Sequence, residues 1–214
     1  QTAGAFAQAF WQPNSRISIN GGTRADAGWV HIQAHSQALY SAGGDFRGIF
    51  ERNPDIRRQY VAPSWAVGAS WLPVPGLNIK FNAASAFRFP QPYELAANGV
   101  HHGAFRHEQG DAGLKPERGY SLDATVAYTH AHWGLTLTPF ASRYPNFIFL
   151  QPAPRFSTLP EGGQLYAYTQ TDAVLYGGEA RLSAHTGFGL SISAGADYVR
   201  GHNRTDALPL PFMP

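Results

Sequence analysis

The chain has 214 residues, a net charge of +2 and no cysteine, and 14% of its residues are charged while another 14% are aromatic. An ordinary soluble domain carries roughly 25% charged residues, so this composition favours a β-barrel in a membrane over a soluble β protein. The lack of cysteine excludes disulfides, thiolate zinc sites and cysteine nucleophiles. Neither sign of charge forms a long block, which argues against nucleic-acid binding. No apolar run approaches the ~20 residues of a membrane helix, and we expect no signal peptide in residues 1–11.

Apolar and polar residues alternate in short runs along most of the chain. After an opening run that stops near Pro13 and a second run through Ile17, a long polar stretch covers roughly 28–58. Further alternating runs occupy 60–74, 77–89, 120–131, 134–150, 166–184 and 190–201. Such alternation predicts about eight antiparallel strands.

The breaks between the runs differ in length. Tight breaks fall near 14, 75, 132 and 187, and all the breaks between them are longer. Short turns that alternate with long loops are typical of an up-and-down outer-membrane barrel, which has its turns on the periplasmic side. A soluble sheet has no reason to sort its loops in this way.

The run at 120–131 shows the two faces expected of a membrane strand. Tyr120, Leu122 and Val126 fall on one face, and Asp123 and Thr125 fall on the other. From Tyr120 to Tyr128 the strand would span about 26 Å at ~3.3 Å per residue, and tilt shortens this toward the height of the apolar band of such barrels. We therefore expect Asp123 to face the barrel interior.

The segment 87–117 interrupts this pattern with prolines, glycines and three histidines. Pro92 suits the first turn of a helix and Gly99 lies where a helix would stop, so a short helix is expected over 92–98. Asp111 to Gly113 reads as a turn. A loop of this size in a compact domain is usually functional.

This segment resembles the signature of TonB-dependent outer-membrane receptors. In these proteins a strand ends in F-R-x-P, the loop carries E-L and G-x-H, and G-D/N-x-x-L-K-P-E opens the next strand. The matching residues are Phe87, Arg88, Pro90, Glu94, Leu95, Gly99, His101, Gly110, Leu114, Lys115, Pro116 and Glu117. Residues 140–152, 166–182 and the closing 208–214 are also similar to later strands and a loop of the family.

The resemblance implies a 22-stranded barrel, plugged by an N-terminal domain, that imports a scarce nutrient such as an iron-siderophore, haem or zinc. The TonB–ExbB–ExbD complex would supply the energy for import. The barrel would lie in the lipid of the cell outer membrane and would bind an extracellular small-molecule or metal ligand. Residues 1–214 would be a partial barrel domain, an all-β, antiparallel segment of about eight strands, with the plug and the C-terminal strands absent. The alternative is a small, self-contained outer-membrane β-barrel enzyme or an adhesion or binding module.

The loop supplies the candidate ligand-binding residues. These are His101, His102, His107, Glu108, Tyr93 and Glu94. Neutral imidazole binds zinc or haem iron well, so the three histidines are candidate metal ligands, with zinc or haem as a transported ligand. The alternatives are that His101 and His102 brace the loop or line a solvated vestibule, and that Glu94 and Glu117 fasten it through ion pairs with Arg88 or Lys115. No catalytic motif stands out, so we predict that the chain is not an enzyme.

Overall fold

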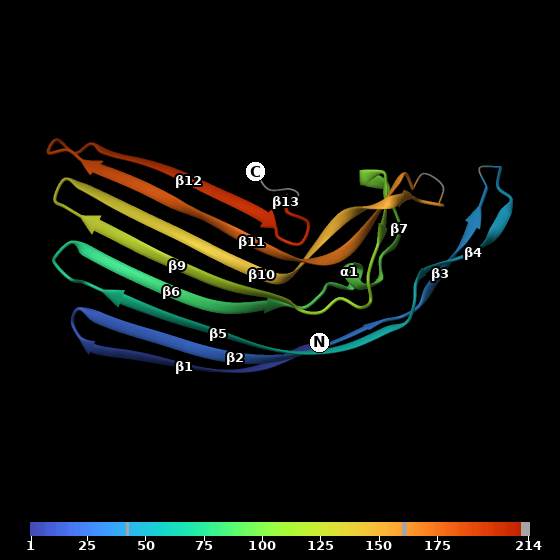
Figure 1. The fold of residues 1–214 in the computed structure, drawn as a ribbon, viewed down its shortest axis with the longest axis horizontal. Coiled ribbons are helices and arrows are strands. Elements are labelled where there is room, and N and C mark those ends of the chain that lie inside the picture. Colours follow the sequence, from blue (N-terminus) through green and yellow to red (C-terminus); the bar gives the residue numbers. More distant parts are fainter. Residues whose placement is uncertain (42, 160–161, 211–214) are drawn as a thin grey trace.

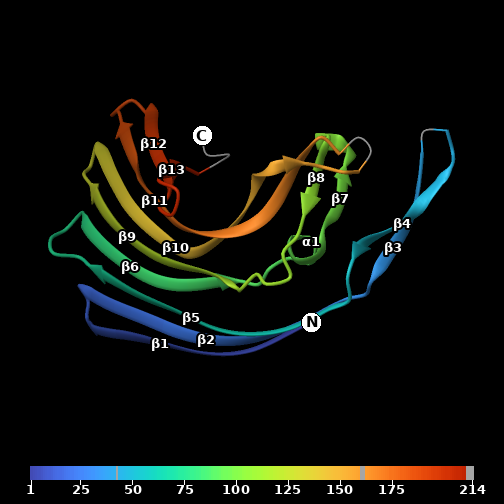
Figure 2. The same cartoon turned by 45° about the vertical axis from the view of Figure 1, so that its right-hand side comes forward.

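The computed structural model describes residues 1–41, 43–159 and 162–210 and consists almost entirely of strands. Figures 1 and 2 show one long, curved sheet whose strands run side by side. The strands of this sheet are β1 (Thr2–Asn14), β2 (Ile17–Ile32), β5 (Ile56–Trp71), β6 (Leu77–Arg88), β9 (Glu117–Thr129), β10 (Trp133–Phe156), β11 (Gln164–His185), β12 (Ser191–Asn203) and the short β13 (Leu208–Pro209). A separate hairpin joins β3 (His35–Tyr40) to β4 (Phe46–Asn53).

The strands pair in the order β1-β2-β5-β6-β9-β10-β11-β12-β13, each antiparallel to the next. Eight of them are long, namely all except β13, and this confirms the predicted strand number and connectivity. The four short connections fall at 15–16, 72–76, 130–132 and 186–190, as predicted. All four lie at one end of the sheet in Figure 1. We call this the turn end and the opposite end the loop end.

One face of the sheet is apolar and is exposed in the isolated chain. On β9 the side chains of Tyr120, Leu122 and Val126 are 44%, 52% and 41% exposed. The register continues this face across the neighbouring strands, since Leu122 pairs with Ala83 and Ala141, and Val126 pairs with Ile79 and Leu137. Below we call this the apolar face. An apolar face open to solvent would be unfavourable in water and is what contact with lipid requires.

The opposite, polar face is held together by side-chain hydrogen bonds between strands. Asn82 Nδ2 donates to Asp123 Oδ2 over 2.7 Å, and the hydroxyls of Ser121 and Ser142 are 2.9 Å apart. Asp123 therefore lies on the predicted face. Figure 2 shows that the sheet is curved and that α1 lies on its concave side.

The polar stretch at 28–58 consists largely of strands that the sequence did not predict. β2 continues to Ile32, the β3–β4 hairpin occupies the middle, and β5 begins at Ile56. The break expected between the runs 134–150 and 166–184 is also shorter than the sequence predicts, because β10 runs through Pro152 to Phe156. β10 pairs with β9 only up to Arg143 and beyond it has only β11 as a partner, so proline there removes no bond to a second neighbour.

The loop between β6 and β9 has its own small elements. They are α1 (Pro92–Ala96), β7 (Asn98–His101), the 3-10 turn η1 (His102–Ala104) and β8 (Arg106–Gln109). β8 pairs with β7 and lies parallel to β11, where His107 is opposite Leu165. No helix among the described residues is long and apolar enough to cross a membrane. Of the closing segment 208–214, only Leu208 to Leu210 are described and the rest lies outside the described residues.

Candidate functional site

The short helix α1 forms where the sequence predicts it. Pro92 starts the helix, and the Glu94 carboxylate accepts a hydrogen bond from the backbone amide of Gln91 over 2.7 Å. This contact satisfies an amide that the helix itself cannot pair. The amide of Ala97 donates to the carbonyl of Tyr93 and closes the last turn.

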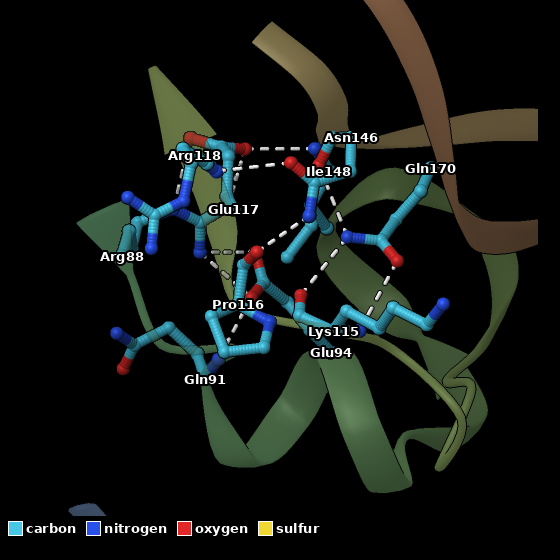
Figure 3. A network of polar contacts seen from close by, with 10 residues as sticks. All are labelled: Arg88, Gln91, Glu94, Lys115, Pro116, Glu117, Arg118, Asn146, Ile148 and Gln170. Carbon is cyan, nitrogen blue, oxygen red and sulfur yellow. Dashed lines mark hydrogen bonds and ion pairs between the residues drawn. The ribbon is translucent and has the colours of Figure 1, made fainter. Parts of the chain in front are cut away.

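Arg88 binds the two acidic residues of the signature, and Figure 3 shows the three side chains converging. Its Nη1 lies 2.9 and 2.8 Å from the two carboxylate oxygens of Glu94, and its Nη2 lies 3.2 Å from Glu117 Oε2. Glu94 is 5% exposed. The contacts confirm that both glutamates fasten the loop to Arg88, and they leave Glu94 little surface for a ligand.

The start of β9 is tied to β10 and β11 by a second set of bonds. Glu117 also accepts a hydrogen bond from the backbone amide of Ile148 at 2.7 Å. The side chain of Asn146 binds the two residues that flank Glu117, accepting from the amide of Arg118 and donating to the carbonyl of Pro116. Gln170 accepts from the amide of Lys115 and donates to its carbonyl. Lys115 forms no ion pair within the described ranges, so the suggested pairing with a glutamate is not seen there, and its backbone does the fastening (Figure 3).

A small apolar core lies under the helix. It comprises Ile56, Leu95, Leu114 and Ile148, with Val30, Ile32, Ala96, Ala112 and Tyr168 packed against it. Gly110 passes so close to α1 that a Cβ there would lie 2.6 Å from the amide nitrogen of Ala96. The glycine of the signature is therefore needed for close backbone contact, and the loop is a packed unit.

His107 is a buried residue of this unit. It is 6% exposed, and its Nδ1 and Nε2 lie 2.9 Å from Ser157 Oγ and 2.9 Å from Asn98 Oδ1. Burial, followed by the charges of Arg155 and Arg52, lowers the pKa of its imidazole from 6.5. His107 thus links β7, β8 and the β10–β11 loop as a neutral ring, a bracing role that the sequence did not predict for this histidine.

His101 and His102 lie apart from His107 and are exposed. Within 1–41, 43–159 and 162–210, no group of three or more His, Asp or Glu side chains is close enough to hold a metal ion. The structure therefore does not bring the three histidines together, and His107 could ligate a metal only after losing a hydrogen bond. Metal binding by His101 and His102 stays a prediction.

Tyr93 and Glu108, by contrast, belong to one cluster. The Tyr93 ring is 56% exposed and lies 5.7 Å from the Tyr168 ring, edge to face. The hydroxyl of Tyr168 donates to Glu108 Oε2 at 3.5 Å, and Glu108 pairs with Arg106 at 2.8 Å. The guanidinium of Arg106 lies over the Tyr166 ring.

Three members of this cluster, Arg106, Tyr166 and Tyr168, were missed by the sequence analysis. The one available signal was a spacing of two residues, from Arg106 to Glu108 and from Tyr166 to Tyr168, which places each pair on one side of a strand. An exposed aromatic ring beside a charged pair can bind a flat or polar ligand.

The sequence model of the family described as TonB dependent receptor-like, beta-barrel, matches residues 1–214. The chain therefore belongs to the TonB-dependent receptor β-barrel family, whose members are outer-membrane proteins. A search of curated proteins gives no significant match.

Several solved structures share the fold. The copper transporter OprC superposes with a TM-score of 0.78 at 21% identity, over 98% of this chain and 30% of that one. The Serratia marcescens hemophore receptor HasR, solved as a double mutant with its hemophore HasA and heme, gives 0.66 at 17% identity, over 94% and 33%. The Neisseria meningitidis iron transporter FrpB gives 0.62 at 15% identity, over 97% and 27%. The chain thus spans about a third or less of the length of these structures.

Proposed function

We propose that this chain is a wall segment of an outer-membrane receptor that actively imports a scarce nutrient. The observation that carries the proposal is the sheet itself, which has an apolar face across eight long strands, a hydrogen-bonded polar face, and short turns at one end. One face suits lipid and the other suits the interior of a barrel. The turn end would lie in the periplasm and the loop end outside the cell.

The sheet is open along β1, which pairs only with β2 among the described strands. An unpaired strand edge leaves backbone amides and carbonyls without partners, and lipid supplies none. We therefore expect further strands to close the barrel, and a plug domain to fill it. The plug would couple the receptor to the TonB–ExbB–ExbD complex.

For the substrate we propose a transition metal carried as an ion, a siderophore chelate or haem. The similar structures named above are a copper transporter, a hemophore receptor with heme bound and an iron transporter. Exposed His101 and His102, and the ring of Tyr93 beside Glu108, would contact the ligand at the loop end. Glu94 and His107 would hold the loop in shape.

Uptake in cells tests the proposal. A strain lacking the whole receptor should lose uptake of one labelled compound among ferric siderophores, haem, zinc and copper, because the other receptors do not carry it. The intact gene should restore uptake, and a strain without TonB should not respond to it. Unchanged uptake of every compound, or restoration without TonB, would contradict the proposal.

The role of the exposed histidines needs a separate measurement. If they ligate the metal, His101→Ala with His102→Ala should weaken binding to the purified receptor at least about tenfold, or 1.4 kcal/mol. His35→Ala is the matched control, since His35 is also exposed at the loop end but lies on the separate β3–β4 hairpin. Equal binding by the wild type, the double variant and the His35 variant would show that His101 and His102 do not ligate the metal. It would leave the proposal of a nutrient receptor intact.

The enzyme alternative has one geometric feature in its favour, the chain of contacts in which His107 binds Ser157 through Nδ1 and Asn98 through Nε2. We assign it a structural role because Ser157 Oγ also accepts the amide of Leu159 and so closes a turn. A serine nucleophile needs its oxygen free to attack a substrate. Ester hydrolysis by the purified receptor that disappears in Ser157→Ala would reverse this assignment.

A further inference from the structure

The apolar face changes character where β10, β11 and β12 approach the loop end. Tyr120 pairs with Arg143, Arg143 with Val174, and Val174 with His202, so these residues form one row across four strands. Toward the turn end from this row the face carries exposed Leu122, Leu137, Tyr176 and Tyr198. The row therefore marks the boundary of the apolar band.

Arginines occur at three positions near this boundary, namely Arg143, Arg200 and Arg204. Arg143 and Arg204 both bind Asp172, with Arg143 Nη2 and Nε 3.0 and 3.2 Å from its carboxylate and Arg204 Nη1 3.4 Å away. Arg200 lies on β12 opposite Tyr176, one pair inside the row. Arg200 is exposed, and it forms no ion pair with the described residues. We call Arg143, Arg200 and Arg204 the arginine cluster.

The protein holds part of this cluster in a fixed position. The amide of Arg204 donates to the carbonyl of Asp172, and the amide of Asp172 donates to Thr205 Oγ1. The turn after β12 is thus fastened to β11. The side chains of Arg143 and Arg204 remain 55% and 50% exposed, whereas that of Asp172 is 26% exposed. The carboxylate is covered and the guanidinium groups face outward.

Positive charge exceeds negative charge here. Arg143 and Arg204 share the carboxylate of Asp172, and with Arg200 and with Asp206, which accepts a hydrogen bond from Asn203, the boundary carries three positive charges against two negative ones. The planar fork of arginine matches a phosphate group and binds it through two parallel bonds. Basic groups beside a membrane surface attract anionic lipid headgroups.

We propose that the arginine cluster binds the phosphate of a phosphorylated lipid in the outer leaflet. The phosphate would lie on the three arginines, and its acyl chains would run along the apolar face over Leu137, Ala180 and Tyr198. Tyr176 and Tyr198 are exposed on this face, where a tyrosine ring suits the border between headgroup and chain. The position favours a lipid over free phosphate, because the cluster is continuous with the apolar face. The proposal uses only the contact of this face with lipid and is independent of the nutrient carried.

The test measures lipid binding to the whole receptor. Purified receptor would be placed in vesicles of phosphatidylcholine, with or without lipid A as the phosphorylated probe, and lipid A retained by the protein would be counted by native mass spectrometry. Each arginine near a membrane surface contributes about 1 kcal/mol, or about fivefold, so replacing all three by glutamine should reduce retention at least about tenfold. Arg181→Gln is the control, because Arg181 lies on the polar face of β11 opposite Thr136.

Two further arms keep the test decisive if the triple variant does not fold. Arg200→Gln breaks no ion pair with the described residues and should still lower retention about fivefold. Inorganic phosphate should compete poorly with lipid A. Equal retention by the wild type, the Arg200 variant and the control would overturn the proposal, and so would full displacement by inorganic phosphate, which would indicate a phosphate site unrelated to the membrane.

Discussion

Arg88 binds two carboxylates at once, and the geometry of these contacts explains why the F-R-x-P signature has arginine at this position. Its guanidinium binds Glu94 through Nη1 and Glu117 through Nε and Nη2. The ammonium of lysine is a single point of charge and could not span both acids. The side chains of Glu94 and Glu117 are only 6% and 12% exposed, so without Arg88 two nearly buried negative charges would face each other.

Arg88→Gln should therefore loosen the whole loop. We expect a loss of about 3 kcal/mol in the free energy of loop opening, since breaking a buried ion pair leaves charges uncompensated. Amide hydrogen exchange of residues 91–116 would measure it. Arg57→Gln is the control because Arg57 forms an exposed ion pair with Asp55, and its loss should cost under about 1 kcal/mol. Equal exchange rates in the two variants would contradict the prediction.

His107 makes the same loop sensitive to pH. Its pKa in the folded protein lies below the usual 6.5, because burial and the nearby Arg155 and Arg52 disfavour the charged ring. The unfolded loop therefore binds a proton more readily than the folded one. The stability that neutral His107 provides is complete above pH 6.5 and is lost as pH falls from 6.5 toward and below the folded pKa.

Protease cleavage in the 98–109 region should accordingly speed up between pH 7 and pH 5. His107→Gln should remove most of this dependence while keeping a polar side chain between Asn98 and Ser157. His102→Gln, at an exposed position, should behave as the wild type. A His107→Gln protein that keeps the full pH dependence would show that another group is responsible.

At the level of elements, α1 and Gly110, the residue after β8, are brought together by one close backbone contact. Gly110→Ala would place a Cβ 2.6 to 2.8 Å from the backbone of Leu95, Ala96 and Ala97. The loop would have to shift, at a cost of about 2 kcal/mol. Gly103→Ala is the matched control in the same loop, because its nearest contact would be 3.5 Å away. Comparable thermal stability of the two variants would contradict the prediction.

The sequence predicts the elements well where one face is apolar and poorly elsewhere. β9 alternates cleanly between Tyr120 and Tyr128, and the four turns near 14, 75, 132 and 187 follow from the breaks. Beyond the apolar band the patterns are short, because β2 adds only Val30 to Ile32 after Trp29 and β5 begins with Ile56 followed by three polar residues, and neither is long enough to predict a strand. Prolines in β10 look like breaks because the sequence does not reveal that this part of the strand has a single partner.

The loop shows the same limit for side chains. His101, His102 and His107 are close in sequence, but β7, η1 and β8 turn the chain so that His107 points to Ser157, 50 residues away. Spacing alone does not predict such a contact. The pairing of Arg88 with Glu94 and Glu117 was predictable because the residues close the two ends of one loop.

For the whole molecule, the separation into an apolar and a polar face decides how the sheet can enter a membrane. Val126 and Ala127 are neighbours on β9, and their side chains lie on opposite faces of the sheet. Val126 pairs with Ile79 and Leu137 on the apolar face, and Ala127 pairs with Asn78 and Thr136 on the polar face. The two positions therefore allow the same substitution to be compared at nearly the same depth.

Val126→Arg in the whole receptor should reduce folding stability by about 1–3 kcal/mol, because it places a charge against lipid inside the apolar band, two residues from Tyr128. Ala127→Arg should cost much less, since its side chain would join Asn78 and Thr136 on the polar face. Urea unfolding in lipid vesicles would measure both, and the amount of receptor in isolated outer membranes would give an independent readout. If Ala127→Arg were as damaging as Val126→Arg, the apolar face would not be the lipid-facing one. If neither substitution mattered, the sheet would not be part of a membrane wall, because a wall must present an uncharged face to hydrocarbon along its whole height.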